Sequence, residues 1–217
     1  WPFSSPFSYV RGLPPPRIYD LTMNDNSIFC ECDRCREETE RYGHSGRQLR
    51  FVNAVAAKVG AGHPEQLFST AAYLHSEPTP KGGVRAADNV VVKLCNTRQN
   101  MSEGIGHPDN RFMHDQTIAW SSCAKNLFVW EYAITFNQQT KGFPFPSEFH
   151  IVDKYRFYAR HGVKGFLIEH ENPAVSDMYE LKYYLERRVL EDPEVDGEAL
   201  IGEFMSRYYG AAGAKIL

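Results

Sequence analysis

The sequence predicts an α/β protein made of about five βα units, the C-terminal part of a TIM (β/α)8 barrel with parallel strands. Short segments rich in β-branched and aromatic residues alternate with longer segments of helical periodicity. The connections are mostly short, as is typical of βα units. An open doubly wound sheet shows the same alternation, but no glycine-rich phosphate loop follows any predicted strand. The sequence therefore favours the barrel.

The predicted elements follow one another regularly along the chain. The strands are residues 17–23, 66–73, 89–95, 126–132 and 163–169. The helices lie after residue 45 as far as Gly60 or Gly62, at 112–124, from Pro146 to Gly162, at 177–190, and in a last segment that Gly210 ends. We expect an irregular proline-rich segment at residues 1–16, followed by a partial barrel domain over residues 17–217.

The composition excludes several classes of partner. The net charge is −3, and the 24 basic and 27 acidic residues are interspersed, so we expect no nucleic-acid partner. No run of about 18 apolar residues occurs, so we expect no membrane span. The chain starts at Trp1 rather than at Met and ends in a stretch of small residues, which predicts that it is part of a longer protein.

Polar and aromatic side chains recur where the predicted strands end, which is where ligands bind in parallel βα proteins. The candidates for substrate binding are Asn24, Tyr73, His75, Asn96, Arg98, Trp130, Tyr132 and His170. Aromatic rings stack on the apolar faces of sugars, while amides and carboxylates bind hydroxyl groups. This mixture predicts an uncharged oligo- or polysaccharide substrate.

Three carboxylates at strand ends are candidates for catalysis. Glycoside hydrolysis needs a pair of carboxyl groups across the scissile bond. Asp25 and Glu131 are the favoured pair, with Asp25 as general acid/base and Glu131 as nucleophile or general base; Glu169 is the third candidate. Such a carboxylate can instead cap the next helix or form a salt bridge. No cofactor is expected in catalysis.

The spacing Cys-x-Cys-x-x-Cys predicts a metal site. Cys30, Cys32 and Cys35 can bring three thiolates to one ion, as tetrahedral zinc requires. Cys95, Cys123 or a residue outside this chain is the candidate for the fourth ligand. The zinc would be structural, clamping the loop after the first strand. Reduced cysteines, or one disulfide and a spare thiol, are the alternatives.

Several motifs resemble one known family. They are Asn24-Asp25, Phe29 to Cys35, Leu49 to Ala56, Ala72-Tyr73, Val129 to Tyr132, Gly162 to Gly165 and Phe204 to Gly210. Together they resemble a bacterial, glycoside-hydrolase-like family catalogued as domain of unknown function 4838. The resemblance implies a carbohydrate-active (β/α)8 barrel in which these segments are the later strands, and a secreted or periplasmic location. It assigns no catalytic residue.

A more distant similarity is to the zinc-bearing family 42 β-galactosidases. Those barrels carry Asn-Glu after strand four, followed by Cys-x-Cys-x-x-Cys, and a second Glu after strand seven. Asn24-Asp25 with the cysteines is similar to the first feature, and Glu131 to the second. Asp25 departs from this pattern because its side chain is one methylene shorter than Glu.

The function that we expect is glycoside hydrolysis by a carboxylate pair in the complete protein. Since a half barrel lacks half of its rim, the present chain alone is expected to be inactive. A non-catalytic barrel module that binds glycans is one alternative. A zinc-organised interaction domain, whose functional surface is the cysteine loop, is the other.

Overall fold

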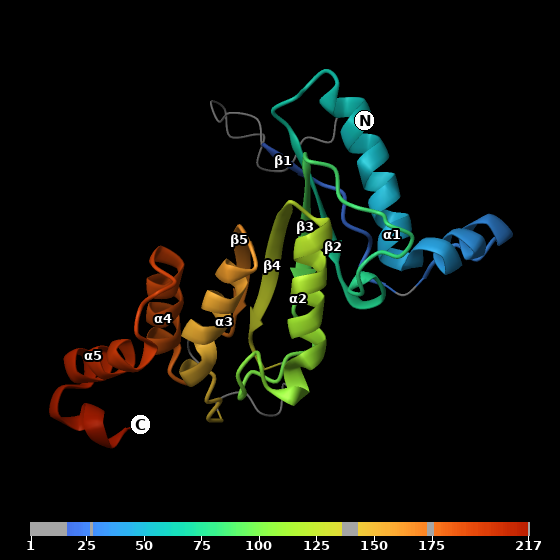
Figure 1. Ribbon diagram of the computed structural model, residues 1–217. Helices are drawn as coiled ribbons and strands as arrows, with labels where there is room; N and C mark the ends of the chain where they lie inside the picture. Colours follow the sequence, from blue (N-terminus) through green and yellow to red (C-terminus); the bar gives the residue numbers. More distant parts are fainter. Residues whose placement is uncertain (1–16, 27, 136–142, 173–175, 217) are drawn as a thin grey trace.

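The computed structural model describes residues 17–26, 28–135, 143–172 and 176–216, so the proline-rich segment 1–16 lies outside the described residues. Five parallel strands form one sheet, curled as half a barrel, in the order β1-β2-β3-β4-β5 (Figure 1). The strands are β1 Ile18–Asp20, β2 Leu67–Ala72, β3 Val90–Cys95, β4 Asn126–Ala133 and β5 Gly165–His170. The predicted α/β class with a parallel sheet is confirmed.

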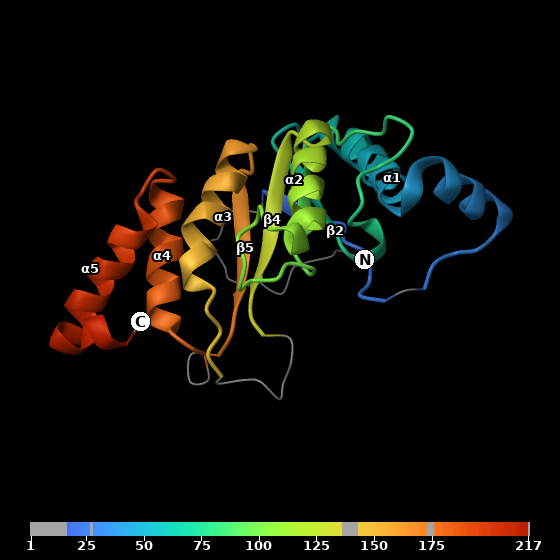
Figure 2. The ribbon, with the colours of Figure 1, turned by 60° about the horizontal axis from the view of Figure 1, so that its bottom comes forward.

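The helices lie along one side of this sheet (Figure 2). They are α1 Asp33–Gly60, α2 Arg111–Cys123, α3 Glu148–Arg160, α4 Tyr179–Glu191 and α5 Gly197–Tyr209. Each strand pairs with the next strand in the sequence. Since parallel crossovers are right-handed, a constant order of strands puts every connection on the same face. The sheet is therefore singly wound, whereas a doubly wound sheet reverses its order and carries helices on both faces.

The β2–β3 connection contains no α-helix. It consists of the 3-10 helix η2 (Leu74–Ser76) and an irregular segment that crosses the sheet between α1 and α2. Trp120 of α2 donates its indole N–H to the Glu77 carbonyl at 2.7 Å. Asn53 of α1 donates to the Arg85 carbonyl at 2.8 Å. These bonds let the irregular segment replace a helix as the cover of β2 and β3.

Two elements differ from their predicted bounds by more than two residues, β1 and α1. β1 is shorter than 17–23, because only Ile18 to Asp20 pair with β2. α1 is longer than predicted, because residues 33–42 are also helical and join the second part at a bend where Gly43 has φ 74°. Residues 33–42 are rich in the helix formers Arg and Glu but have little apolar periodicity, so their helix left no amphipathic pattern to detect.

Alternation along β4 separates the two faces of the sheet. Leu127 and Val129 point into the core beneath the helices, where Tyr155 and Tyr158 of α3 are also buried. Trp130 and Tyr132, at the alternate positions, are half-buried on the opposite face. We call that opposite side of the half barrel the concave face. Side chains one residue apart thus lie in different environments.

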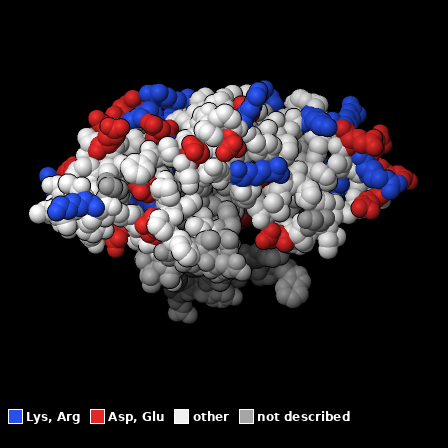
Figure 3. Space-filling view, turned by 90° about the horizontal axis from the view of Figure 1, so that it is seen from below, with Lys and Arg blue, Asp and Glu red and all other residues white. Residues whose placement is uncertain are grey.

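Acidic and basic side chains are interspersed on the face seen in Figure 3. Within the described part of the chain, no helix is both long and apolar enough to cross a membrane.

Candidate functional site

The concave face carries a group of side chains at the carboxyl ends of the strands. Cys95 pairs in register with Trp130, and Tyr132 pairs with Glu169. Tyr73 continues β2 in extended conformation, with φ −139° and ψ 136°, so it points to the opposite side from the buried Ala72. The concave-face cluster consists of Asp25, Tyr73, Cys95, Trp130, Tyr132 and Glu169.

Two aromatic rings form the centre of this cluster. Trp130 and Tyr132 stack with their centroids 6.0 Å apart and their planes at 13°. The Trp130 indole N–H donates to Glu169 Oε2 at 3.3 Å, which fixes this carboxylate beside the rings. Glu169 itself is exposed. A flat apolar surface thus lies next to a carboxylate that solvent and ligands can reach.

Asp25 lies at the β2 side of the cluster, where the Tyr73 hydroxyl is hydrogen-bonded to its carboxylate. Burial raises the pKa of Tyr73, and the charge of Asp25 raises it further. Burial likewise raises the pKa of Tyr132, with further increases from Cys95, Tyr73 and Glu169. Burial raises the pKa of the Cys95 thiol to about 12. At neutral pH the hydroxyl groups of Tyr73 and Tyr132 and the thiol of Cys95 are therefore protonated.

A second polar group on the concave face was not predicted from the sequence. Asp20 accepts hydrogen bonds from Ser69 at 2.6 Å and from Lys93 at 2.9 Å. Burial raises the pKa of Asp20, but these bonds outweigh it and the pKa is lowered. Lys93 also lies 5.8 Å from the centroid of the Trp130 ring. The sequence signal for this group was the position of Lys93 inside the apolar run 90–95, because a charged residue there needs a polar partner.

Glu131 lies on the other side of the sheet, although it stands between Trp130 and Tyr132 in the sequence. Its side chain is fully buried and forms an ion pair of 3.1 Å with Lys154 of α3. Asn96 donates to both of its oxygens at 3.0 Å, and the Tyr158 hydroxyl donates to one of them at 3.1 Å. The structure therefore does not bring Glu131 together with Asp25.

Two other predicted substrate residues, His170 and Arg98, also face away from the cluster. His170 Nε2 lies 3.0 Å from Glu186 of α4, and the hydrogen bond to Glu186 raises the pKa of His170. Arg98 Nε lies 2.7 Å from the buried Glu77. These contacts join the ends of β5 and β3 to α4 and to the β2–β3 connection. Asn24 and His75 are both exposed, Asn24 after β1 and His75 in η2.

The predicted cysteine cluster is present. The sulfur atoms of Cys30, Cys32 and Cys35 all lie within 4.8 Å of one another, so they could hold a metal ion. Cys32 precedes the first turn of α1 and Cys35 lies within that turn. Among the described residues, neither Cys95 nor Cys123 belongs to this group. Cys95 is instead hydrogen-bonded to Tyr132 in the concave-face cluster.

The fold and the site define a singly wound α/β half barrel with carboxylates and aromatic rings on its concave face. The chain belongs to the family described as Domain of unknown function (DUF4838), whose family model matches residues 9–217. This match confirms the predicted family. No curated protein and no solved structure matches the chain. The similarity to β-galactosidases stays a prediction.

Proposed function

We propose that this chain forms part of the catalytic barrel of a glycoside hydrolase, with the sugar bound on the concave face. The observation that carries the proposal is the stacked pair of Trp130 and Tyr132 beside the Glu169 carboxylate. A sugar ring offers apolar C–H groups to such rings and hydroxyl groups to the adjacent carboxylate. The constant strand order supports five consecutive units of a (β/α)8 barrel, whose active site lies at this end of the strands.

Asp25 and Glu169 are the carboxylates that we assign to the reaction. Both are exposed, and both adjoin the same group of aromatic side chains. Asp25 would protonate the leaving oxygen as general acid, and Glu169 would attack the anomeric carbon or activate water. Since Glu131 is paired with Lys154 on the other face, we assign it a structural role. Glu169, the third candidate from the sequence, thus replaces Glu131 in the pair.

We also propose that the cysteine cluster binds a structural zinc ion. Thiolates are preferred zinc ligands, and sites rich in cysteine are usually structural. Bound zinc would attach the exposed segment that carries Asp25 to the start of α1. It would supply no step of the hydrolysis.

Hydrolysis of a panel of aryl glycosides and polysaccharides by the complete protein tests the catalytic assignment. Glu169→Gln and Asp25→Asn should each lower kcat by about 10²–10⁴-fold, as loss of an acid, a base or a nucleophile does. Binding of the same glycan, measured by calorimetry, should be retained in both. If both variants keep full kcat on a substrate that the unmodified protein cleaves, the assignment of these carboxylates is wrong.

Trp130→Ala tests the sugar platform. It should weaken glycan binding by about tenfold or more, equivalent to about 1.4 kcal/mol or more. Tyr183→Ala is the matched control, because Tyr183 is an exposed aromatic residue on the outer helix α4. A protein that binds glycans but cleaves none of the panel would be a glycan-binding module. A protein that does neither would contradict both functions.

A further inference from the structure

The three thiols leave a tetrahedral metal site one ligand short. Zinc in structural sites is almost always four-coordinate, and three cysteines with one histidine form one of the common sets. Among the described residues, no fourth Cys, His, Asp or Glu atom lies within the 4.8 Å group. Within the described part of the chain, a fourth ligand would have to be a side chain that moves a short distance when the ion binds.

The bend in α1 directs its second half toward the cysteines. Gly43 interrupts the helix with φ 74° and ψ 169°. Beyond the bend, Arg47 reaches back to the first half, where its Nη1 lies 3.4 Å from the Cys35 carbonyl oxygen and 3.1 Å from Thr39 Oγ1. His44 precedes Arg47 by three residues, so both lie on the same face of the helix. That face is the one that meets the cysteine segment.

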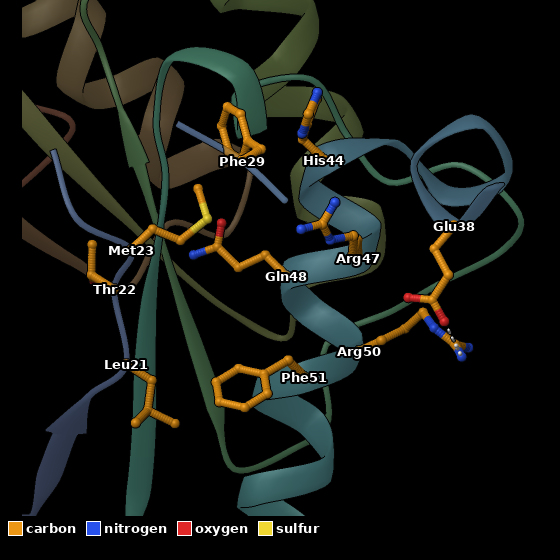
Figure 4. A pocket seen from close by; sticks show the side chains of 10 residues that line it. All are labelled: Leu21, Thr22, Met23, Phe29, Glu38, His44, Arg47, Gln48, Arg50 and Phe51. Carbon is orange, nitrogen blue, oxygen red and sulfur yellow. Dashed lines mark ion pairs between the residues drawn. The ribbon is translucent and has the colours of Figure 1, made fainter. Parts of the chain in front are cut away.

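His44 packs against Phe29, the residue that directly precedes Cys30. The Phe29 ring lies against the His44 ring, with their centroids 4.5 Å apart. Figure 4 shows Phe29 and His44 close together, with Arg47 following along α1. Cys30, Cys35 and His44 also line one cavity of about 330 Å³. A ligand set drawn from these residues would enclose an ion within this cavity.

We propose that Cys30, Cys32, Cys35 and His44 together form a Cys3His site for zinc or a similar divalent ion. His75 lines the same cavity, and its ring lies 5.7 Å from the His44 ring. His44 is favoured because its ring lies closer to the ring of Phe29, the residue before Cys30. The distance between ring centroids is 4.5 Å for His44 and 5.2 Å for His75. His44 also belongs to the same helix as Cys35. The inference rests on the proposed zinc but is independent of glycan cleavage.

The site would also fix the segment that bears Asp25. Residues 23–26 and 28 are exposed. Hydrogen bonds such as Asn26 N to the Asn24 carbonyl and Ile28 N to Asn26 Oδ1 lie within the segment itself. Bound metal would attach its far end to both halves of α1. Loss of metal should therefore increase amide hydrogen exchange in this segment while leaving β3 and β4 protected.

The ligand set can be tested with metal ions alone, on the full chain under reducing conditions. After chelation, the protein is titrated with Co²⁺ and then with Zn²⁺, and the zinc form is measured by X-ray absorption. We expect one ion per chain, with three sulfur atoms at about 2.3 Å and one nitrogen at about 2.0 Å. His44→Ala should remove the nitrogen and weaken zinc binding by about tenfold or more, since even outer-shell changes cost about 10–100-fold.

His75→Ala is the matched control and should keep both the nitrogen and the affinity. Cys32→Ser should lose one sulfur in the absorption spectrum. The circular dichroism of each metal-free variant shows whether it still folds. Four results would each overturn the proposal: no metal binding by the unmodified chain, oxygen as its fourth ligand, an unchanged His44→Ala site, or loss of the nitrogen in His75→Ala instead. None of them depends on hydrolysis, so failure here is separate from failure of the glycosidase assignment.

Discussion

The buried pair of Glu131 and Lys154 allows a sharp test of where the chemistry lies. In Glu131→Gln the Lys154 ammonium, which is only 5% exposed, loses its counter-charge. Within the described residues, its other hydrogen-bond partner is the Met101 sulfur at 3.5 Å, a weak acceptor. The new amide would also point an N–H₂ group at donors that the carboxylate now accepts from, namely Asn96 or Tyr158.

The expected loss of stability follows from this burial. Removal of one partner from a buried ion pair costs about 3–5 kcal/mol, because the other charge stays uncompensated. With a urea m-value of about 2 kcal/mol/M, the midpoint should fall by about 2 M. The double variant Glu131→Gln/Lys154→Met should recover much of this loss, since it leaves no buried charge unpaired.

Urea unfolding followed by circular dichroism measures both effects. Glu169→Gln is the matched control, because the same chemical change at this exposed carboxylate should alter stability by no more than about 0.5 kcal/mol. The two carboxylates should thus separate, with Glu131 affecting stability and Glu169 affecting turnover. If Glu131→Gln unfolds at the unchanged midpoint and yet abolishes hydrolysis, then Glu131 acts on the substrate and the concave-face assignment is refuted.

Two further predictions concern β5, the strand that ends at His170, and a third concerns the helix α5. The hydrogen bond to Glu186 raises the pKa of His170 above its value in the unfolded chain. The pair therefore stabilises the fold fully at pH values below the unfolded histidine pKa of about 6.5. This stabilisation is lost as the pH rises through the pKa of the folded state. His170→Ala should therefore destabilise the protein more at about pH 5.5 than at about pH 8.5 in thermal unfolding; an equal loss at both would show that the bond carries no charge-dependent stability. Gly165→Ala should destabilise by about 1–3 kcal/mol, because a Cβ there would lie 2.6 Å from the Phe128 ring. Gly202 lies in the helix α5 with open space around it, so Gly202→Ala should instead stabilise the protein by about 0.5–1 kcal/mol. Urea unfolding midpoints in the reverse order, with Gly165→Ala above Gly202→Ala, would contradict the packing argument.

The sequence determined the order and type of most elements. Strand segments such as 89–95 are short apolar runs rich in β-branched residues, and the helices α2, α3 and α4 carry apolar residues at helical spacing. Both signals are local, so they survive without tertiary information. The first half of α1 was missed because its residues are polar and have no buried face to generate a pattern.

The cysteine spacing also determined the thiol cluster, because residues two and three apart stay close in any compact conformation. The role proposed for His44 could not be found in this way. It depends on the bend at Gly43, which brings a residue nine positions after Cys35 back toward the thiols. Sequence separation alone gives no such geometry.

The tertiary structure alone decided which strand-end residues can meet one ligand. Trp130, Glu131 and Tyr132 are consecutive, and the sequence offered no means to tell which face of β4 would meet α3. The period of two along a strand then placed Glu131 against Lys154 and the two rings on the concave face. A change of one position would have exchanged their environments. The candidate carboxylates were thus visible in the sequence, but their pairing was set by the packing of the helices onto one side of the sheet.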